Sequence, residues 1–438
     1  MKITLVAPAS EVSRRRGAHP LGTSYFHYYK LGIATIAGAT PEGFDIEAID
    51  EFVDLWNPET HETDAVAISV MTALAPRAYR IADTFRRRNI PVILGGMHVT
   101  FLPDEALRHA DAVVTGPGEL VWHHVCHDLK NGHLKSRYEA PCDDSWISVP
   151  AARRDIFTNP KYPQLDMVQF SRGCVHRCLF CSINVFSGGR YQRRDIEEVK
   201  AEFPDLRRKH LMVADDNLYG DRAYCLKALE ALAPLNRYIG IQATVNMAFD
   251  EEVMDAAQRA GTGAVFVGLE SVIGDSLNET NKNHNPIERY AEAVESFHRH
   301  GIFVEGGLMF GFDHDDPSVF ERTLKFVNDI DLDVAQVAVV TPMPGTPLHQ
   351  RLDAEGRIFD RDWSRYDCNN VVFKPKLMSV DELEKGLAWF RGEYYSRRSI
   401  ARRSFSGWKN FDLMTWATQT ALNLGFRKNH RLGLDYPP

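Results

Sequence analysis

"SRGCVHRCLFC", residues 171–181, places three cysteines in one short loop directly after the apolar segment 166–171, which predicts a β-strand. Cys174, Cys178 and Cys181 have the spacing C-x3-C-x2-C, although the whole chain contains only 7 cysteines. A cubane iron–sulfur cluster is usually held by cysteine thiolates, one for each iron. Three thiolates from one loop therefore predict a [4Fe-4S] cluster whose fourth iron is open to a small molecule.

Structural zinc and inert buried thiols are the two alternatives to a cluster. Structural zinc normally takes four ligands in two separated pairs, and the sequence has no second C-x2-C pair. His176 offers a possible fourth ligand, but it lies inside the loop itself. Inert cysteines would need no regular spacing, so the pattern favours the cluster.

The composition predicts a soluble, cytoplasmic protein of two or three domains. The chain has 438 residues, of which 44% are hydrophobic, so it can bury a large core. Its net charge of -8 gives no general attraction for nucleic acid or for an anionic membrane. No segment approaches the roughly 20 apolar residues of a membrane span, and the short apolar N-terminus predicts a strand instead of a signal peptide. The remaining cysteines are scattered, which fits a reducing compartment.

The cysteine loop opens a region in which apolar strands alternate regularly with helical segments. Six such units in succession predict a partial (β/α)6 TIM barrel over residues 166–345. Chemistry in such barrels sits at the C-terminal ends of the strands, which is where the cysteines lie. The predicted strands are 166–171, 210–215, 238–244, 263–270, 303–312 and 334–342.

Residues 1–140 also alternate strand and helix, and they predict a separate α/β domain with a Rossmann-like parallel sheet. Ligands bind such sheets in the crevice beyond the strand ends, where "GG" (95–96) and "GPGE" (116–119) stand, although these glycines are equally well understood as turn residues. The proline-rich segment 141–165 predicts a linker, and residues 346–438 predict a mainly helical C-terminal region. The predicted strands are 2–8, 45–50, 65–70, 90–96 and 110–116.

The cysteine motif after the first strand of a six-unit barrel, with an aromatic residue before the last cysteine, resembles the radical S-adenosylmethionine (SAM) superfamily. The stretch "DAVAISVMTALAPRAYRIADTFRRRNIPVILGGMHVTFLPDEAL" (64–107) and "VFVGLES" (265–271) resemble its branch with a cobalamin-binding domain, which is class B methyltransferase-like. The resemblance extends over nearly the whole chain.

The resemblance implies that the open iron of the cluster chelates SAM. Reduction of SAM would break its C5′–S bond, and the 5′-deoxyadenosyl radical would abstract a hydrogen atom from the substrate. Glu270 is implied to bond the ribose hydroxyls and Phe180 to lie against the adenine, whereas loop capping accounts equally well for Asp216 and Asn217. The implied SAM-binding residues are Phe180, Asp215, Asp216, Asn217, Gln242, Gly268 and Glu270.

The resemblance also implies cobalamin as a cofactor of the N-terminal domain. The family's D-x-H-x-x-G motif is incomplete, because Gly17 stands where the aspartate should precede His19. Members of the branch commonly lack the motif, so the cofactor is expected without a histidine ligand. The implied crevice residues are Ser69, Thr72, Pro76, Arg77, Gly95, Gly96, Gly116 and Glu119.

The implied function is cobalamin-dependent methylation of an unactivated carbon in a lipid or secondary metabolite. One alternative keeps the radical chemistry for cyclisation, C–C coupling or rearrangement, with the cobalamin domain vestigial or accessory. A second alternative is a non-enzymatic iron–sulfur protein, which would usually supply four cysteines. The expected partners are a small-molecule or lipid-like substrate and a flavodoxin- or ferredoxin-type electron donor.

The C-terminal region is rich in aromatic residues, which are either helix core or the lining of an apolar substrate cavity. The segment "TPMPGTP" (341–347) ends the sixth predicted strand, so its prolines and Gly345 shape the rim of the barrel. The aromatic residues are Trp363, Tyr366, Trp389, Tyr394, Tyr395, Trp408 and Trp416.

Overall fold

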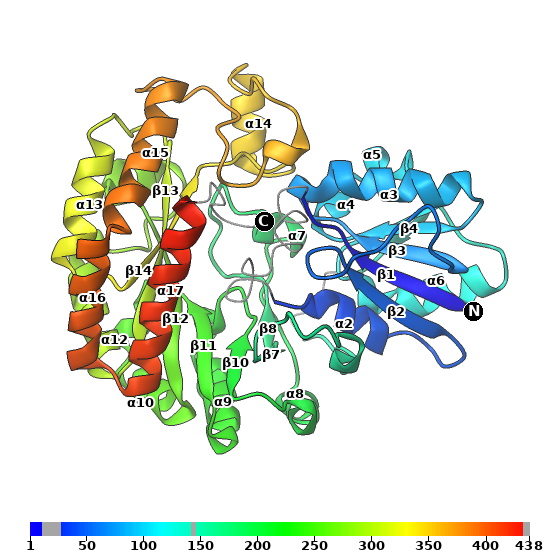
Figure 1. The fold of residues 1–438 in the computed structure, drawn as a ribbon, viewed down its shortest axis with the longest axis horizontal. Coiled ribbons are helices and arrows are strands. Elements are labelled where there is room, and N and C mark those ends of the chain that lie inside the picture. The colour runs from blue at the N-terminus through cyan, green and yellow to red at the C-terminus, as the bar shows by residue number, and fades with distance from the viewer. Residues whose placement is uncertain (11–27, 142–145, 432–438) are drawn as a thin grey trace.

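The computed structural model describes residues 1–10, 28–141 and 146–431. Figure 1 shows two parts side by side, each built around a parallel β-sheet with helices packed against it. The first part is blue to cyan in the figure and the second is green to red. The predicted α/β class is therefore confirmed for both halves of the chain.

The first sheet has the strand order β2-β1-β3-β4-β5-β6, and all its pairs are parallel. Its five predicted strands are present, whereas β6 was not predicted because it is only three residues long and two of them are polar and exposed. The strands are β1 (Lys2–Ala7), β2 (Asp45–Asp50), β3 (Ala65–Ser69), β4 (Val92–Gly95), β5 (Ala112–Thr115) and β6 (Arg137–Glu139). The helices are α2 (Leu31–Gly38), α3 (Ala75–Arg87), α4 (Met97–Phe101), α5 (Pro103–Leu107) and α6 (Trp122–Lys130).

The order of the first sheet reverses direction between β1 and β3, since the chain passes first to β2 on one side and then to β3 on the other. Doubly wound sheets bind ligands at this switch point, beyond the carboxyl ends of the strands. The topology therefore predicts a ligand site beyond the carboxyl ends of β1, β3 and β4, and we call this edge of the first sheet the crest.

The second sheet has the order β14-β13-β12-β11-β10-β7 with parallel pairing throughout, as expected for a six-unit partial barrel. Because β7 and β14 are the two edges and do not pair with each other, the barrel is open. The strands are β7 (Leu165–Val168), β10 (His210–Val213), β11 (Tyr238–Ala243), β12 (Thr262–Glu270), β13 (Phe303–Phe310) and β14 (Val334–Val339). The helices are α7 (Ser182–Phe186), α8 (Ile196–Lys200), α9 (Arg222–Leu232), α10 (Glu251–Ala260), α11 (Gly274–Glu279), α12 (Tyr290–Arg299), α13 (Val319–Asp329) and α14 (Pro347–Ala354).

Two details of the barrel differ from the sequence prediction. The end of the first predicted strand turns away as β8 (Ser171–Arg172), which pairs antiparallel with β9 (Gln192–Arg193). The helix expected over 195–208 is shortened to α8 and a separate turn at Phe203–Asp205. Pro204, which has no N–H to donate, accounts for the break.

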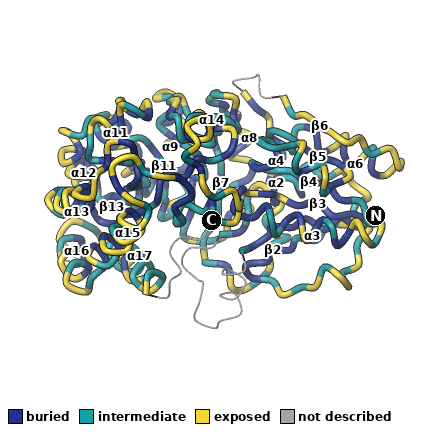
Figure 2. Tube along the Cα trace, turned by 90° about the horizontal axis from the view of Figure 1, so that it is seen from above, coloured by how far each residue is buried: buried dark blue, intermediate teal, exposed yellow. Residues whose placement is uncertain are grey.

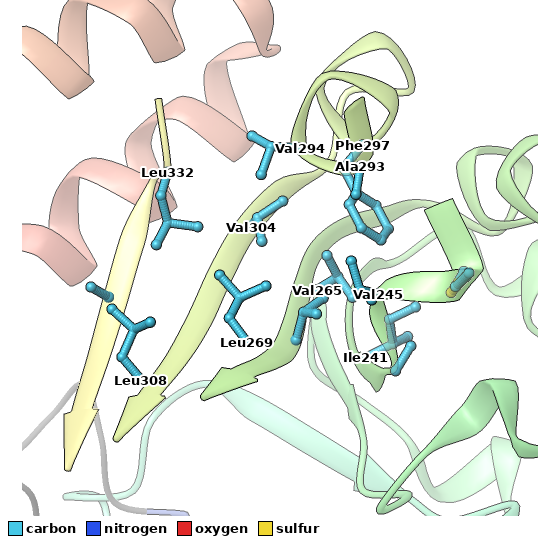
Figure 3. Close-up of a cluster of buried hydrophobic side chains, with 14 of the residues drawn as sticks. Ile241, Val245, Val265, Leu269, Ala293, Val294, Phe297, Val304, Leu308 and Leu332 are labelled. Atoms are coloured by element: carbon cyan, nitrogen blue, oxygen red, sulfur yellow. The ribbon is translucent and has the colours of Figure 1, made fainter. Parts of the chain in front are cut away.

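Alternation along the barrel strands separates an outer apolar face from an inner face. Figure 3 shows Ile241, Val265, Leu269 and Val304 on the outer side, packed with Phe297 and its neighbours on α12. Figure 2 colours the described residues by burial and shows buried strands inside, with exposed positions on the helices around them. The side chains on the inner face of the strands therefore line the interior of the barrel.

Local signals in the sequence fix the ends of the outer helices. The side chains of Asp221 and Asp250 accept backbone hydrogen bonds at the starts of α9 and α10. Gly261 ends α10 with φ +87°, and a Cβ there would lie 2.3 Å from the carbonyl oxygen of Arg237. Only glycine fits this left-handed, crowded position.

The C-terminal region is helical, with α15 (Val380–Tyr394), α16 (Arg397–Asn410) and α17 (Leu413–Arg431). Tyr394 and Tyr395 are buried, and their hydroxyls donate to the carbonyl oxygens of Leu332 and Ala335, each at 2.7 Å. These contacts attach the helices to β14. Within the described residues, no helix combines the length and the apolar character that a membrane crossing requires.

Truncation of Phe297, which is 1% exposed in the outer core, should destabilise the barrel by about 3–5 kcal/mol, because the cavity left behind cannot fully collapse. The measurement is the shift of the urea unfolding curve of Phe297→Ala. The matched control is Phe405→Ala on the surface of α16, where the side chain is 63% exposed and the change should stay within about 0.5 kcal/mol. Equal shifts in the two variants would contradict the assigned core.

Candidate active site

The cysteine loop leaves the barrel at the C-terminal end of β7. Gly173 begins it with φ +78°, and a Cβ at this position would lie 1.9 Å from the carbonyl oxygen of Arg190. The backbone N–H of Gly173 donates to the carboxylate of Asp216 at 2.8 Å. The loop is thus held against the end of β10, with the hairpin β8–β9 beside it.

Asp215 lies beneath the loop and is fully buried. Its carboxylate accepts the backbone N–H groups of Phe170 and Ser171 at 2.8 and 2.7 Å, and the Ser171 hydroxyl as well. Burial raises the pKa of Asp215 to about 7. Since both oxygens accept hydrogen bonds from the loop, Asp215 braces the loop, and its contact with the methionine part of SAM stays a prediction.

The three thiols converge on one another. Burial, together with the negative charges of Cys181 and Cys174, raises the pKa of Cys178 to about 12, although the charge of Lys282 acts to lower it. Burial also raises the pKa of Cys181. Hydrogen bonds from the backbone N–H groups at the start of α7 act in the opposite direction and lower it. Asn217 donates its side-chain N–H to the sulfur of Cys174 at 3.6 Å. Crowded, buried thiols deprotonate most readily when a metal takes the charge, so this donor set fits a cluster with three protein ligands.

Lys282 is the functional residue that sequence reasoning missed. It is 8% exposed, forms an ion pair with Glu270, and its ammonium lies 5.9 Å from the ring centroid of Phe180. Burial opposes its charged form, yet the Glu270 carboxylate and the Cys178 and Cys181 thiols raise the pKa of Lys282. A positive charge is therefore fixed between the thiols and Glu270. No periodicity or spacing in "ETNKNHN" (279–285) marks this lysine.

Glu270 and Gly268 stand together at the end of β12, as the sequence predicted. Glu270 has φ +65°, and a Cβ on Gly268 would lie 2.4 Å from the Glu270 carboxylate and 2.7 Å from the Lys282 ammonium. The glycine thus leaves room for this charged pair, whose contacting atoms are the ends of flexible side chains. Asn285 donates to the carbonyl oxygen of Gly268 at 2.8 Å and fixes the strand end.

His176, the alternative fourth ligand of a zinc site, stacks flat on His284. The ring centroids are 3.6 Å apart and the rings are inclined by 5°. Burial, and then the charge of Lys282, lower the pKa of His176. The ring is therefore a neutral wall of the site.

The remaining predicted SAM residues divide into rim and lumen. Asp216 and Asn217 act as loop caps, the alternative given by their sequence, and Asn217 also accepts the backbone N–H of Thr244 at 3.2 Å. Phe180 lies near Phe312 at the rim, with ring centroids 6.3 Å apart. Gln242 lies on β11 and faces a cavity inside the barrel.

The predicted cobalamin residues lie at the crest of the first sheet. Ser69 is exposed at the end of β3, and Thr72 and Pro76 follow it at the start of the α3 segment. Gly96 has φ +99°, and a Cβ there would lie 2.8 Å from the backbone nitrogen of Val70. Gly95, Gly96 and Gly116 place no side chains on the crest. Their absence is compatible with tight turns and also with a ligand close to the backbone. His19 lies outside the described residues.

Two charged residues of the predicted crevice are bound to protein partners. The Arg77 guanidinium forms a bidentate ion pair with Glu51, with a distance of 2.9 Å from Nε. Glu119 forms an ion pair with Arg172 of the cysteine loop. The Glu119 carboxylate thereby joins the first sheet to the cluster loop, and its place in a cobalamin crevice stays a prediction.

The crest and the rim also meet through apolar contacts. A Cβ on Gly345, which has φ +81°, would lie 3.1 Å from Val185 on α7 and 3.6 Å from Phe101 on α4. The "TPMPGTP" segment thus packs between the two halves. The first sheet's domain and the rim of the barrel are therefore in contact here as well as through Glu119 and Arg172.

Comparison with known proteins agrees with this arrangement. The radical SAM superfamily model matches residues 168–327, and the B12 binding domain model matches residues 20–125. The chain is 30% identical over 391 residues to the bacteriochlorophyllide d C-12(1)-methyltransferase of Chlorobaculum tepidum, over 85% of this chain and 84% of that protein. It is 29% identical over 369 residues to the C-8(2)-methyltransferase of the same organism, over 79% and 81% of the two chains.

A solved structure shows the same fold. TsrM from Kitasatospora setae, a radical SAM methyltransferase with cobalamin and a [4Fe-4S] cluster bound, matches 99% of both chains with a TM-score of 0.71 at 14% identity. The chain belongs to the radical SAM superfamily. More particularly, it is an enzyme of the cobalamin-dependent methyltransferase branch, and its cofactors are a [4Fe-4S] cluster, SAM and cobalamin.

Replacement of any one loop cysteine should abolish most cluster binding, because each thiolate holds one iron of about four. We expect Cys178→Ala to lose most of its iron and its iron–sulfur absorption after anaerobic reconstitution. Cys225→Ala is the matched control, since Cys225 is a buried thiol on α9. A Cys178→Ala protein with the iron content of wild type would refute the assignment of the ligands.

Proposed function

We propose that this enzyme methylates an unactivated carbon of a small, largely apolar molecule, a lipid or secondary metabolite, held between the crest and the barrel. The observation that carries the proposal is the ion pair between Glu119 and Arg172. It joins the crest of the cobalamin-type domain directly to the loop of the three thiols. A substrate at this junction would meet both cofactors without any domain movement.

In this proposal Cys174, Cys178 and Cys181 hold the cluster, which supplies the electron that cleaves SAM. Glu270 accepts hydrogen bonds from the ribose hydroxyls, and Phe180 contacts the adenine. Lys282 offsets the negative charge of the thiolates and attracts the SAM carboxylate. Gly268 leaves the space that this group of charges needs.

We further propose that cobalamin lies on the crest formed by Ser69, Thr72, Pro76 and the glycines, with no protein histidine on the cobalt. The switch point between β1 and β3 supports this position. The proposed domain boundaries are 1–140 for this domain, 141–165 for the linker, 166–345 for the barrel and 346–438 for the C-terminal region. A flavodoxin or ferredoxin is the proposed electron donor.

Two products of SAM test the reaction class. With cobalamin bound and a reductant present, methyl transfer forms S-adenosylhomocysteine, while reductive cleavage forms 5′-deoxyadenosine. We expect both products from the fully loaded enzyme and only 5′-deoxyadenosine from enzyme prepared without cobalamin. If the loaded enzyme never forms S-adenosylhomocysteine, methyl transfer is wrong and a rearrangement or coupling reaction takes its place.

Glu270→Gln should weaken SAM binding roughly 10- to 100-fold, because hydrogen bonds to a charged group contribute about 1.5–3 kcal/mol. The change also leaves the Lys282 ammonium buried beside a neutral partner. The measurement is the Kd for SAM of the reconstituted protein by calorimetry. Glu292→Gln, an exposed change on α12, is the control and should bind SAM as wild type does.

A further inference from the structure

The barrel contains a partly open cavity of about 940 Å³, and of the predicted SAM-binding residues Gln242 lines it. This volume lies at the upper end of the range for small-molecule sites, ~300–1,000 Å³. The cavity extends from the first residues of β10, β11 and β13 up to Gln242, below the rim. Most of its walls are apolar, and they include Met212, Phe266, Phe303, Ala421 and Phe426.

Helix α17 supplies one wall of the cavity. The cavity is lined by Leu165 of β7 and Gln336 of β14, the two edge strands of the open barrel. Three residues of α17 line it as well, namely Ala421, Leu422 and Phe426. Asn423 and Gln419 attach this helix to the start of β14, through the Asp333 carbonyl at 3.0 Å and the Asp333 carboxylate at 3.5 Å. Figure 1 shows α17, in red, running alongside the second sheet. The helix thus takes the place of the strands that a closed barrel would have.

Glu305 introduces a carboxyl group into this apolar space. It lies on the inner face of β13, and the Gln336 side chain is its hydrogen-bond partner. No lysine, arginine or histidine in the described part of the chain forms an ion pair with it. Burial raises the pKa of Glu305 to about 7. Glu305 is half-buried in the wall of this mostly apolar, ligand-sized cavity, and a carboxyl group there without a cationic partner points to a ligand that bonds it.

We propose that the cavity binds the apolar body of the substrate and that Glu305, with Gln336, accepts a hydrogen bond from an ammonium or hydroxyl group at its far end. This inference rests on the proposed function and specifies the substrate class of the same enzyme. Glu305 is five residues before the end of β13, which is about 16 Å at 3.3 Å per residue. The substrate is therefore elongated, with its reacting carbon up to about that distance from its polar end.

This proposal gives the C-terminal region its role through residues other than those expected. Tyr366, Tyr394 and Tyr395 are buried core residues, while Trp389 and Trp408 are exposed. None of these five lines the cavity. The small and aliphatic residues of α17 form its wall instead.

Competition binding to the holoenzyme tests the proposal. The dye Nile red occupies the cavity, and decylamine, decanol and decanoate compete for it with the same tail and different head groups. Decylamine or decanol should displace the dye at least tenfold more effectively than decanoate, since the Glu305 carboxyl attracts a donor and repels an anion. The better of the two donors identifies the head group. Equal displacement by all three compounds, or by none, overturns the proposal.

Two variants and a control locate the binding. Ala421→Trp fills the cavity and should weaken displacement of the dye by decylamine or decanol at least tenfold. Leu424→Trp introduces the same side chain on α17 where the native one is 53% exposed, and this control should bind as wild type does. Glu305→Gln keeps the volume of the side chain and should reduce the preference for decylamine or decanol over decanoate to below about threefold. If Ala421→Trp does not fold, Glu305→Gln decides alone, and an unchanged preference overturns the proposal.

Formation of 5′-deoxyadenosine without substrate separates this inference from the proposed function. The reaction requires the cysteine loop and the SAM site, so it should be unchanged in Ala421→Trp and Glu305→Gln. Normal cleavage with no head-group preference removes the cavity proposal and leaves the methyltransferase. No cleavage by wild type removes the proposed function, whatever the dye reports.

Discussion

The path of the cysteine loop depends on one buried carboxylate. Asp215, at the end of β10, accepts the backbone N–H groups that would otherwise be unpaired where β7 turns into β8. Without this bridge the turn would expose donors inside the protein, which costs more than the bonds themselves contribute. The thiols, the Arg172 ion pair and the rim contacts of α7 all follow this turn in the chain. The catalytic end of the barrel is therefore organised by a buried residue whose carboxylate bonds the backbone of the loop.

Charge balance is the second constraint on the site. Three thiols, Glu270 and Asp216 bring negative charge to the same end of the barrel, and the surrounding burial makes that charge costly. Lys282 is the buried cation that opposes it, and Arg172 adds a second positive group from the loop. A cationic sulfonium ligand suits this anionic environment. The same arrangement accounts for the missing side chain at Gly268, since the ion pair of Lys282 and Glu270 occupies its space.

Regular patterns made most of the fold predictable. Continuous apolar strands and Asp-capped helices recur along 166–345, so the strands of the barrel and the cysteine loop at its rim followed from periodicity. The hairpin β8–β9 and the short β6 carry too few residues to produce a period, and they were missed.

Within the site, Glu270 and Gly268 were found through a motif. Lys282 was not, because its position depends on how a loop folds back over β12, which no local pattern records. The contacts of Asp215 and Glu119 with the cysteine loop were not predicted for a related reason. Sequence places them at strand or loop ends, but the choice between ligand, backbone and ion-pair partner is made by tertiary packing.

An unclosed barrel has a consequence for diversification. Where a closed barrel would have two more strands, this chain uses a single terminal helix, and the residues of α17 that line the cavity belong to neither the cysteine loop nor the predicted SAM site. Exchanging one such helix for another between relatives would reshape the interior without altering the chemistry at the rim. The radical-generating apparatus and the selection of molecules can thus evolve at separate rates along one polypeptide.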